Sequence, residues 1–131
     1  MKGKVLYIED ETFFANTISN KLKEYGFDVD LAADGESGLR ALTETAYDII
    51  LLDLVLPHIG GFDVLKQIPA IEKNKKTPVI VLSNLSSDSD KRTARQLGAR
   101  EFYVKMNSTP SNIATLVISI TGQGADAHIS S

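Results

Sequence analysis

Carboxylates, a hydroxyl and an ammonium group each stand at the end of a short apolar segment of this chain. Apolar runs without polar alternation are typical of strands buried on both faces, as in a parallel sheet covered by helices. The carboxyl ends of such strands meet at one edge, where ligands bind. The segments and the polar residues that follow them are 5–8 with Glu9 and Asp10, 48–52 with Asp53, 79–82 with Ser83, and 102–104 with Lys105.

These residue types define a specific chemistry if they meet. Carboxylates that converge repel one another, and a pair about 4 Å apart costs on the order of 4 kcal/mol at an effective dielectric of about 20. A cation must offset this cost, and carboxylate oxygens with water suit Mg2+. Lys105 supplies a second positive charge and Ser83 a hydroxyl donor. A carboxylate nucleophile with such neighbours makes a phosphoryl-transfer site.

Helical patterns separate the apolar strands. We expect strands at 5–8, 28–32, 48–53, 79–82 and 102–104, and helices at 12–25, 34–44, 62–68, 86–96 and 109–121. Strict alternation of strand and helix predicts an α/β fold with a doubly wound five-stranded parallel sheet and right-handed crossovers. Segment 28–32 alternates polar and apolar residues, as an edge strand does. Asp34 and Thr109 are expected N-caps, the latter followed by Pro110 at the first helical position.

Composition narrows the possible classes. The chain has 131 residues, a size typical of one domain. It contains no cysteine, which excludes disulfides and thiolate chemistry. A net charge of -3 argues against nucleic acid as the main partner. With neither a membrane-spanning apolar stretch nor a signal-peptide pattern, we expect a cytoplasmic protein. Residues 122–131 are small and polar, and we expect a disordered tail or linker remnant there.

Taken together, these motifs resemble the receiver domain of two-component response regulators, over roughly residues 3–121. The matching pieces are Glu9-Asp10, Asp53 followed by Pro57 and Gly61, Ser83 ending an apolar strand, and Lys105 after Phe102-Tyr-Val. No piece is decisive alone, but the five polar residues Glu9, Asp10, Asp53, Ser83 and Lys105, in the right order at the right strand ends, are specific. The resemblance implies a flavodoxin-like (βα)5 sheet with strand order 2-1-3-4-5.

The resemblance also implies how the chain would work. Asp53 would accept a phosphoryl group from a phosphohistidine of a histidine kinase or a histidine phosphotransfer protein. Mg2+ would be bound directly by Asp10, Asp53 and the backbone carbonyl of Val55, and through water by Glu9. Such a domain is a signalling switch, and it catalyses only its own phosphorylation and dephosphorylation.

The same family pattern suggests how the switch moves. Ser83 and Lys105 would contact the phosphoryl oxygens. Phe102 stands at the position of the switch aromatic, which turns inward when Ser83 moves toward the phosphate. Phosphorylation adds charge and strong acceptors, which can bias a bistable loop.

Three positions depart from the family pattern. Met106 replaces the proline that usually follows the lysine in a cis peptide, so either a costly non-proline cis bond is held or the peptide is trans and Lys105 is aimed differently. Asn84 stands where a small residue is favoured and narrows access to the site. Val55 and Leu85 are apolar and would not orient an attacking water, so we expect slow self-dephosphorylation.

Other interpretations remain open at this point. A pseudo-receiver would keep the fold as a constitutive protein-binding module, with Met106 as its clue. The acidic run Glu9–Glu11 could merely favour a helix N-terminus. An aspartate-nucleophile phosphatase would carry a second aspartate at position 55, which is valine here. Neither G-x-G-x-x-G nor a P-loop sequence follows the first strand, which disfavours nucleotide binding.

The last predicted helix has an unusual surface. No charged residue occurs from Thr109 to Gly124. An uncharged outer face favours a contact surface for an effector or a second copy of the chain, although scattered apolar exposure is also normal. We expect Ala114 and Ile118 to be partly exposed, beside a buried stripe formed by Ile113, Leu116, Val117 and Ile120.

Overall fold

The structure is a computed structural model that describes residues 3–122. All neighbouring strands pair in parallel, in the order β2-β1-β3-β4-β5. This confirms the predicted doubly wound sheet and its strand order, including the edge position of β2. The predicted tail lies outside the described residues, apart from Gly122. The strands are β1 (Gly3–Ile8), β2 (Phe27–Ala32), β3 (Ile49–Leu52), β4 (Val79–Ser83) and β5 (Glu101–Val104).

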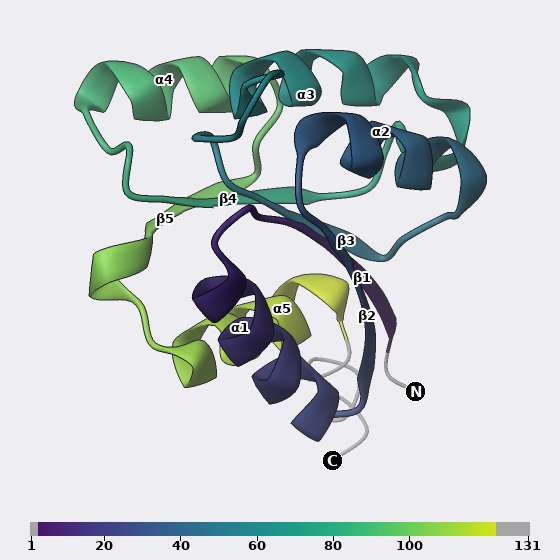
Figure 1. Ribbon diagram of the computed structural model, residues 1–131, viewed down its shortest axis with the longest axis vertical. Coiled ribbons are helices and arrows are strands. Elements are labelled where there is room, and N and C mark those ends of the chain that lie inside the picture. Colours follow the sequence, from purple (N-terminus) through teal and green to yellow (C-terminus); the bar gives the residue numbers. More distant parts are fainter. Residues whose placement is uncertain (1–2, 123–131) are drawn as a thin grey trace.

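Helices cover both faces of the sheet (Figure 1). Helices α1 (Thr12–Glu24) and α5 (Pro110–Thr121) lie on one face, and α2 (Gly35–Glu44), α3 (Gly61–Gln67) and α4 (Asp88–Gln96) lie on the other. Successive residues of a strand point to opposite faces. Leu6 and Ile8 of β1 therefore join the core under α2–α4, while Val5 and Tyr7 join the core under α1 and α5.

The helices begin where the sequence supplies caps. Asp34 Oδ1 accepts a hydrogen bond from the Ser37 N–H at 2.8 Å, which lowers the pKa of Asp34. Thr109 and Asn112 form a reciprocal capping box around Pro110. Both predicted caps are thereby confirmed. Helix α4 begins at Asp88, later than the predicted 86, because Ser87 serves as its N-cap.

The connection before β4 is not a plain polar loop, although it carries Lys73, Lys75 and Lys76. Two short 3-10 turns, Ile68–Ala70 and Glu72–Asn74, follow α3. Asn74 is buried, and its amide donates to the carbonyl oxygens of Leu42 and Thr45, both at 2.7 Å. Its Oδ1 accepts from the Tyr47 N–H at 2.8 Å. The Asn74 side chain thus links the loop after α2 to the segment between α3 and β4. Nothing in the local sequence distinguishes Asn74 from its exposed neighbours.

Helix α5 is rotated relative to the predicted amphipathic stripe. Ala114 is fully buried, so its predicted partial exposure is wrong, whereas Leu116 and Ile120 are only half-buried. The physical reason is that α5 packs against α1 as well as against the sheet, which places the small Ala114 side chain in the interface. The partial exposure expected for Ile118 is confirmed.

Candidate functional site

The carboxyl edge of the sheet brings together polar side chains from three strand ends. Asp53 follows β3, Glu9 follows β1 and Lys105 follows β5. The Lys105 Nζ lies 2.9 Å from Asp53 Oδ2 and 2.8 Å from Glu9 Oε1. All three side chains are almost completely buried. The structure thus places these predicted site residues in direct contact.

Lys105 has a third carboxylate partner. Its Nζ donates to Glu11 Oε1 at 2.9 Å, and it also lies 4.8 Å from the centre of the Phe14 ring. Burial lowers the pKa of Lys105, but hydrogen bonds to Asp53, Glu9 and Glu11 outweigh it and raise the pKa above its ordinary value. The ammonium therefore stays charged. Sequence reasoning treated Glu11 only as part of an acidic helix start and missed this contact.

Glu9 is held by two further donors. The Tyr7 hydroxyl donates to Glu9 Oε1 at 2.8 Å, and the Glu11 N–H donates to Glu9 Oε2 at 3.2 Å. Burial raises the pKa of Glu9 to about 7, against the lowering effect of its bond to Lys105. Burial and the Glu9 charge raise the pKa of Tyr7, so the phenol remains a donor. In an apolar strand sequence, Tyr7 is indistinguishable from an ordinary core residue.

The acidic side chains form a candidate metal site. Glu9, Asp10 and Asp53 each offer one oxygen, and these oxygens lie within 4.8 Å of one another. An all-carboxylate donor set fits Mg2+, which keeps several waters. Asp10 is exposed to solvent, so such waters have room. Both oxygens of Glu9 already contact protein donors, which suits the predicted water-mediated role. The carbonyl of Val55 stays a predicted ligand, and the Val55 N–H donates to Asp53 Oδ1 at 3.1 Å.

Gly61 allows the loop after Asp53 to close. A Cβ at this position would overlap with the backbone oxygen of Asp53 and the Cα of Leu54. The Gly61 N–H instead donates to the Leu54 carbonyl at 2.9 Å. Only glycine lets α3 begin this close to the end of β3, so Gly61 helps to fix the backbone that carries Asp53.

The ends of β4 and β5 complete the site. Ser83 is fully buried, and its Oγ accepts from the Leu85 N–H at 3.3 Å. Asn84 Oδ1 accepts from the Met106 N–H at 3.0 Å and so joins the loops that follow the two strands. Residues 3–122 contain no cis peptide bond, so the bond between Lys105 and Met106 is trans. Of the two alternatives, the trans peptide holds, and Lys105 still reaches Asp53.

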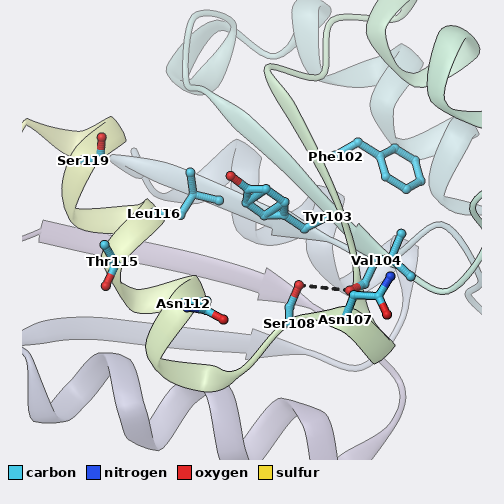
Figure 2. A pocket seen from close by; sticks show the side chains of 9 residues that line it. All are labelled: Phe102, Tyr103, Val104, Asn107, Ser108, Asn112, Thr115, Leu116 and Ser119. Carbon is cyan, nitrogen blue, oxygen red and sulfur yellow. Dashed lines mark hydrogen bonds between the residues drawn. The ribbon is translucent and has the colours of Figure 1, made fainter.

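Phe102 and Tyr103 leave β5 on opposite sides (Figure 2). Phe102 is buried in the core under α2–α4, which is an inward position, and its predicted switch role stays a prediction. Tyr103 lies near Leu116 of α5, beside a pocket of about 570 Å³ whose lining carries no charged side chain. The Ser108 hydroxyl, which lines this pocket, donates to the Val104 carbonyl oxygen at 2.9 Å. The pocket is lined by Phe102, Tyr103, Val104, Asn107, Ser108, Asn112, Thr115, Leu116 and Ser119.

The fold and the site define a doubly wound α/β domain with an acidic, lysine-bridged site at the carboxyl edge of its sheet. The family model of the response regulator receiver domain matches residues 5–125. The chain therefore belongs to the receiver domain family of two-component response regulators, and its domain is a signalling domain. Within residues 3–122, every helix is too short or too polar to cross a membrane.

Similar proteins include two curated regulators. Response regulator ArlR of Staphylococcus saprophyticus is 38% identical over 102 residues, which cover 78% of this chain and 45% of ArlR. Sensory transduction protein RegX3 of Mycolicibacterium smegmatis is 35% identical over 122 residues, which cover 93% of this chain and 52% of RegX3. The chain spans about half the length of these relatives.

Solved receiver structures have the same fold. The Francisella response regulator 1452 receiver domain superposes with a TM-score of 0.83 at 29% identity, covering 93% of this chain and 98% of that one. The receiver domain of the sensor histidine kinase PA1611 of Pseudomonas aeruginosa gives a TM-score of 0.83 at 26% identity, with coverages of 92% and 98%. That protein is described with a magnesium ion coordinated in its active site cleft.

Proposed function

We propose that Asp53 accepts a phosphoryl group from the phosphohistidine of a cytoplasmic histidine kinase or histidine phosphotransfer protein. One observation carries the proposal: a buried carboxylate at the end of β3 lies 2.9 Å from a buried ammonium, within an acidic cluster open to solvent at Asp10. Buried groups with shifted pKa values, such as Glu9 and Lys105, cluster at functional sites, which supports the proposal.

In the transfer, an Asp53 carboxylate oxygen attacks the phosphorus atom. The O–P bond forms as the P–N bond of phosphohistidine breaks, and the imidazole nitrogen keeps the electron pair. Lys105 holds one Asp53 oxygen and the Val55 N–H holds the other, so the nucleophile is oriented before the donor arrives. Lys105 also offsets the negative charge that gathers around the phosphoryl oxygens.

The donor set of the site supports Mg2+ as the cofactor. Asp10, Asp53 and the Val55 carbonyl would hold the ion, with Glu9 acting through water. When bound, Mg2+ neutralises charge on the phosphoryl oxygens. The likeness to the PA1611 receiver supports this assignment, because that domain is described with magnesium in its cleft.

The output is a change of partner or of self-association at α4, β5 and α5. We assign Ser83 as the hydroxyl that contacts the phosphoryl group and Phe102 as the aromatic that follows it. The bond from Met106 to Asn84 joins the loops after β4 and β5, so a movement of the Ser83 loop would also move the segment before α5. The outward side of α5 is polar and uncharged, which suits a docking surface for an effector or a second copy; its exposed residues are Ser111, Asn112, Thr115 and Ser119.

Intact mass after incubation with acetyl phosphate tests the proposal. We expect one added phosphoryl group on the wild type with Mg2+, and none after EDTA treatment or in Asp53→Asn. The same reaction is also run with a phosphorylated histidine kinase, because the proposed donor is a phosphohistidine. A wild type that binds Mg2+ but gains no phosphoryl group from either donor would refute the proposal in favour of the pseudo-receiver.

A further inference from the structure

The ammonium group of Lys105 is surrounded by three carboxylates. Its Nζ lies 2.8 Å from Glu9 Oε1, 2.9 Å from Glu11 Oε1 and 2.9 Å from Asp53 Oδ2. A lysine ammonium has three N–H donors and no more. Glu11 and Asp53 each accept one of these hydrogen bonds, and Glu9 lies against the ammonium as an ion-pair partner. A phosphoryl oxygen that approaches Lys105 therefore competes with three carboxylates for the same ammonium.

The three carboxylates differ in how easily they can leave. The side chain of Glu9 is 0% exposed and that of Asp53 is 3% exposed. Withdrawing the cation from Glu9, or from Asp53 before its O–P bond has formed, leaves an uncompensated buried charge and is strongly unfavourable. The side chain of Glu11 is 54% exposed. Water can replace its contact, and exposed ion pairs contribute little. Glu11 is therefore the partner that leaves at least cost.

The local geometry of Glu11 agrees with an exchangeable contact. Glu11 occupies the N-cap position of α1, yet its side chain caps no helix N–H. It accepts a hydrogen bond from Lys105, which follows strand β5, instead. Its backbone N–H stays bonded to Glu9 whichever way its side chain turns. A released carboxylate would remain beside the N-terminus of α1, where negative charge is favoured.

We propose that Glu11 is the exchangeable counter-ion of Lys105, which a phosphoryl group must displace to reach the ammonium. The inference rests on the proposed function of Asp53 and deepens it. Glu11 is a positioning residue that acts through Lys105. It keeps the lysine paired in the unphosphorylated state and weakens the binding of every phosphoryl donor or analogue.

The test compares Glu11→Gln with a matched control on the same helix. Glu24→Gln removes an exposed α1 carboxylate that pairs with Lys21 at 3.1 Å, far from the site in sequence. Beryllofluoride, a phosphoryl analogue, is titrated by 19F NMR at saturating Mg2+. We expect Glu11→Gln to bind it about three- to fivefold more tightly than the wild type, because a neutral amide competes less well for the ammonium. Glu24→Gln should match the wild type.

Phosphorylation kinetics separate positioning from a general structural effect. In Glu11→Gln the apparent KM for acetyl phosphate should fall by the same factor, while the maximal rate stays unchanged. The affinity for Mg2+ alone should change by less than about twofold, because the Glu11 carboxylate is exposed and well screened. Urea midpoints of both variants should match that of the wild type.

Two results would overturn the inference while leaving the proposed function intact. If Glu11→Gln binds beryllofluoride with the affinity of the wild type, Glu11 does not compete for Lys105. Weaker binding of both beryllofluoride and Mg2+ would make it a support of the metal site. A wild type that takes up neither beryllofluoride nor a phosphoryl group is a separate outcome, because then the function of Asp53 itself fails and the inference falls with it.

Discussion

Replacing Lys105 by methionine removes the only cation that contacts both Asp53 and Glu9 among the described residues. Methionine keeps much of the volume, so the change tests charge rather than packing. Removing one partner of a buried ion pair costs about 3–5 kcal/mol, because the remaining charge is stranded. The contact to Glu11, which is half-exposed, adds less than about 1 kcal/mol. We therefore expect Lys105→Met to lose about 3–5 kcal/mol of unfolding free energy in metal-free buffer.

Urea denaturation of the metal-free protein measures this loss. With an m-value of about 1–3 kcal/mol/M, the midpoint should fall by at least about 1 M. The control is Lys66→Met, since Lys66 and Asp63 are 60% and 64% exposed and 4.0 Å apart. An exposed pair of this kind contributes about 0–1 kcal/mol. Equal midpoints for the two variants would refute the view that Lys105 is the cation that balances the site.

Magnesium provides an internal check on the same variant. An ion bound by Asp10 and Asp53, with Glu9 acting through water, would replace the missing positive charge. At a concentration of about 100 times its Kd, a ligand that binds only the folded state adds about 2.7 kcal/mol. We expect Mg2+ to restore most of the midpoint of Lys105→Met. A variant that remains destabilised at saturating Mg2+ would indicate lost packing instead of lost charge.

Four further changes have definite expected outcomes. Gly61→Ala should destabilise the domain and weaken beryllofluoride binding, because its Cβ would overlap with the backbone at Asp53; urea unfolding and 19F NMR measure both. Asn74→Ala should cost at least about 3 kcal/mol in urea unfolding, because it leaves buried backbone groups without partners at about 1 kcal/mol or more each. The pKa of Asp34 is lowered from its ordinary 3.8, so the stability that its cap contributes is fully present above that pH and is lost as the pH falls through the folded-state pKa. The thermal midpoints of the wild type and of Asp34→Ala should therefore converge in acid. The phosphorylated wild type should have a lifetime longer than minutes in a mass-spectrometric time course. Val55→Asn, which adds a polar group beside the site, should shorten that lifetime.

The fold and the meeting of the strand ends could be predicted because both follow from local patterns. Uninterrupted apolar runs indicate strands buried on both faces, and their alternation with helices dictates a parallel sheet. Once the sheet is parallel, Asp53 and Glu9 must share an edge with Lys105, whatever the details of packing. The edge position of 28–32 follows in the same way from its alternating residues.

Contacts that depend on side-chain direction could not be predicted. The bond between Glu11 and Lys105 joins residues 94 positions apart, and it requires Glu11 to turn away from its own helix. Tyr7 donates to Glu9 only because both side chains lie on the α1 side of the strand end. Ala114 is buried because α5 packs against α1, and the hydrophobic periodicity of α5 does not predict that contact. The contacts of Glu11 and Ala114 depend on the packing of elements that are distant in the sequence, whereas the bond from Tyr7 depends on how the Glu9 side chain turns at the end of its own strand.

The strand order explains the lengths of the side chains at the site, where Lys105 and Glu9 are long and Ser83 is short. Strands lie about 4.8 Å apart, so β5 is about 10 Å from β3, with β4 between them. The strand between them, β4, ends in Ser83, which is small and fully buried. Glu9, which follows β1 one strand further away, needs the extra methylene of glutamate to meet the same ammonium. We therefore expect a bulkier residue at position 83 to push Lys105 away from Asp53, so that the site would lose its central cation although every charged residue remained.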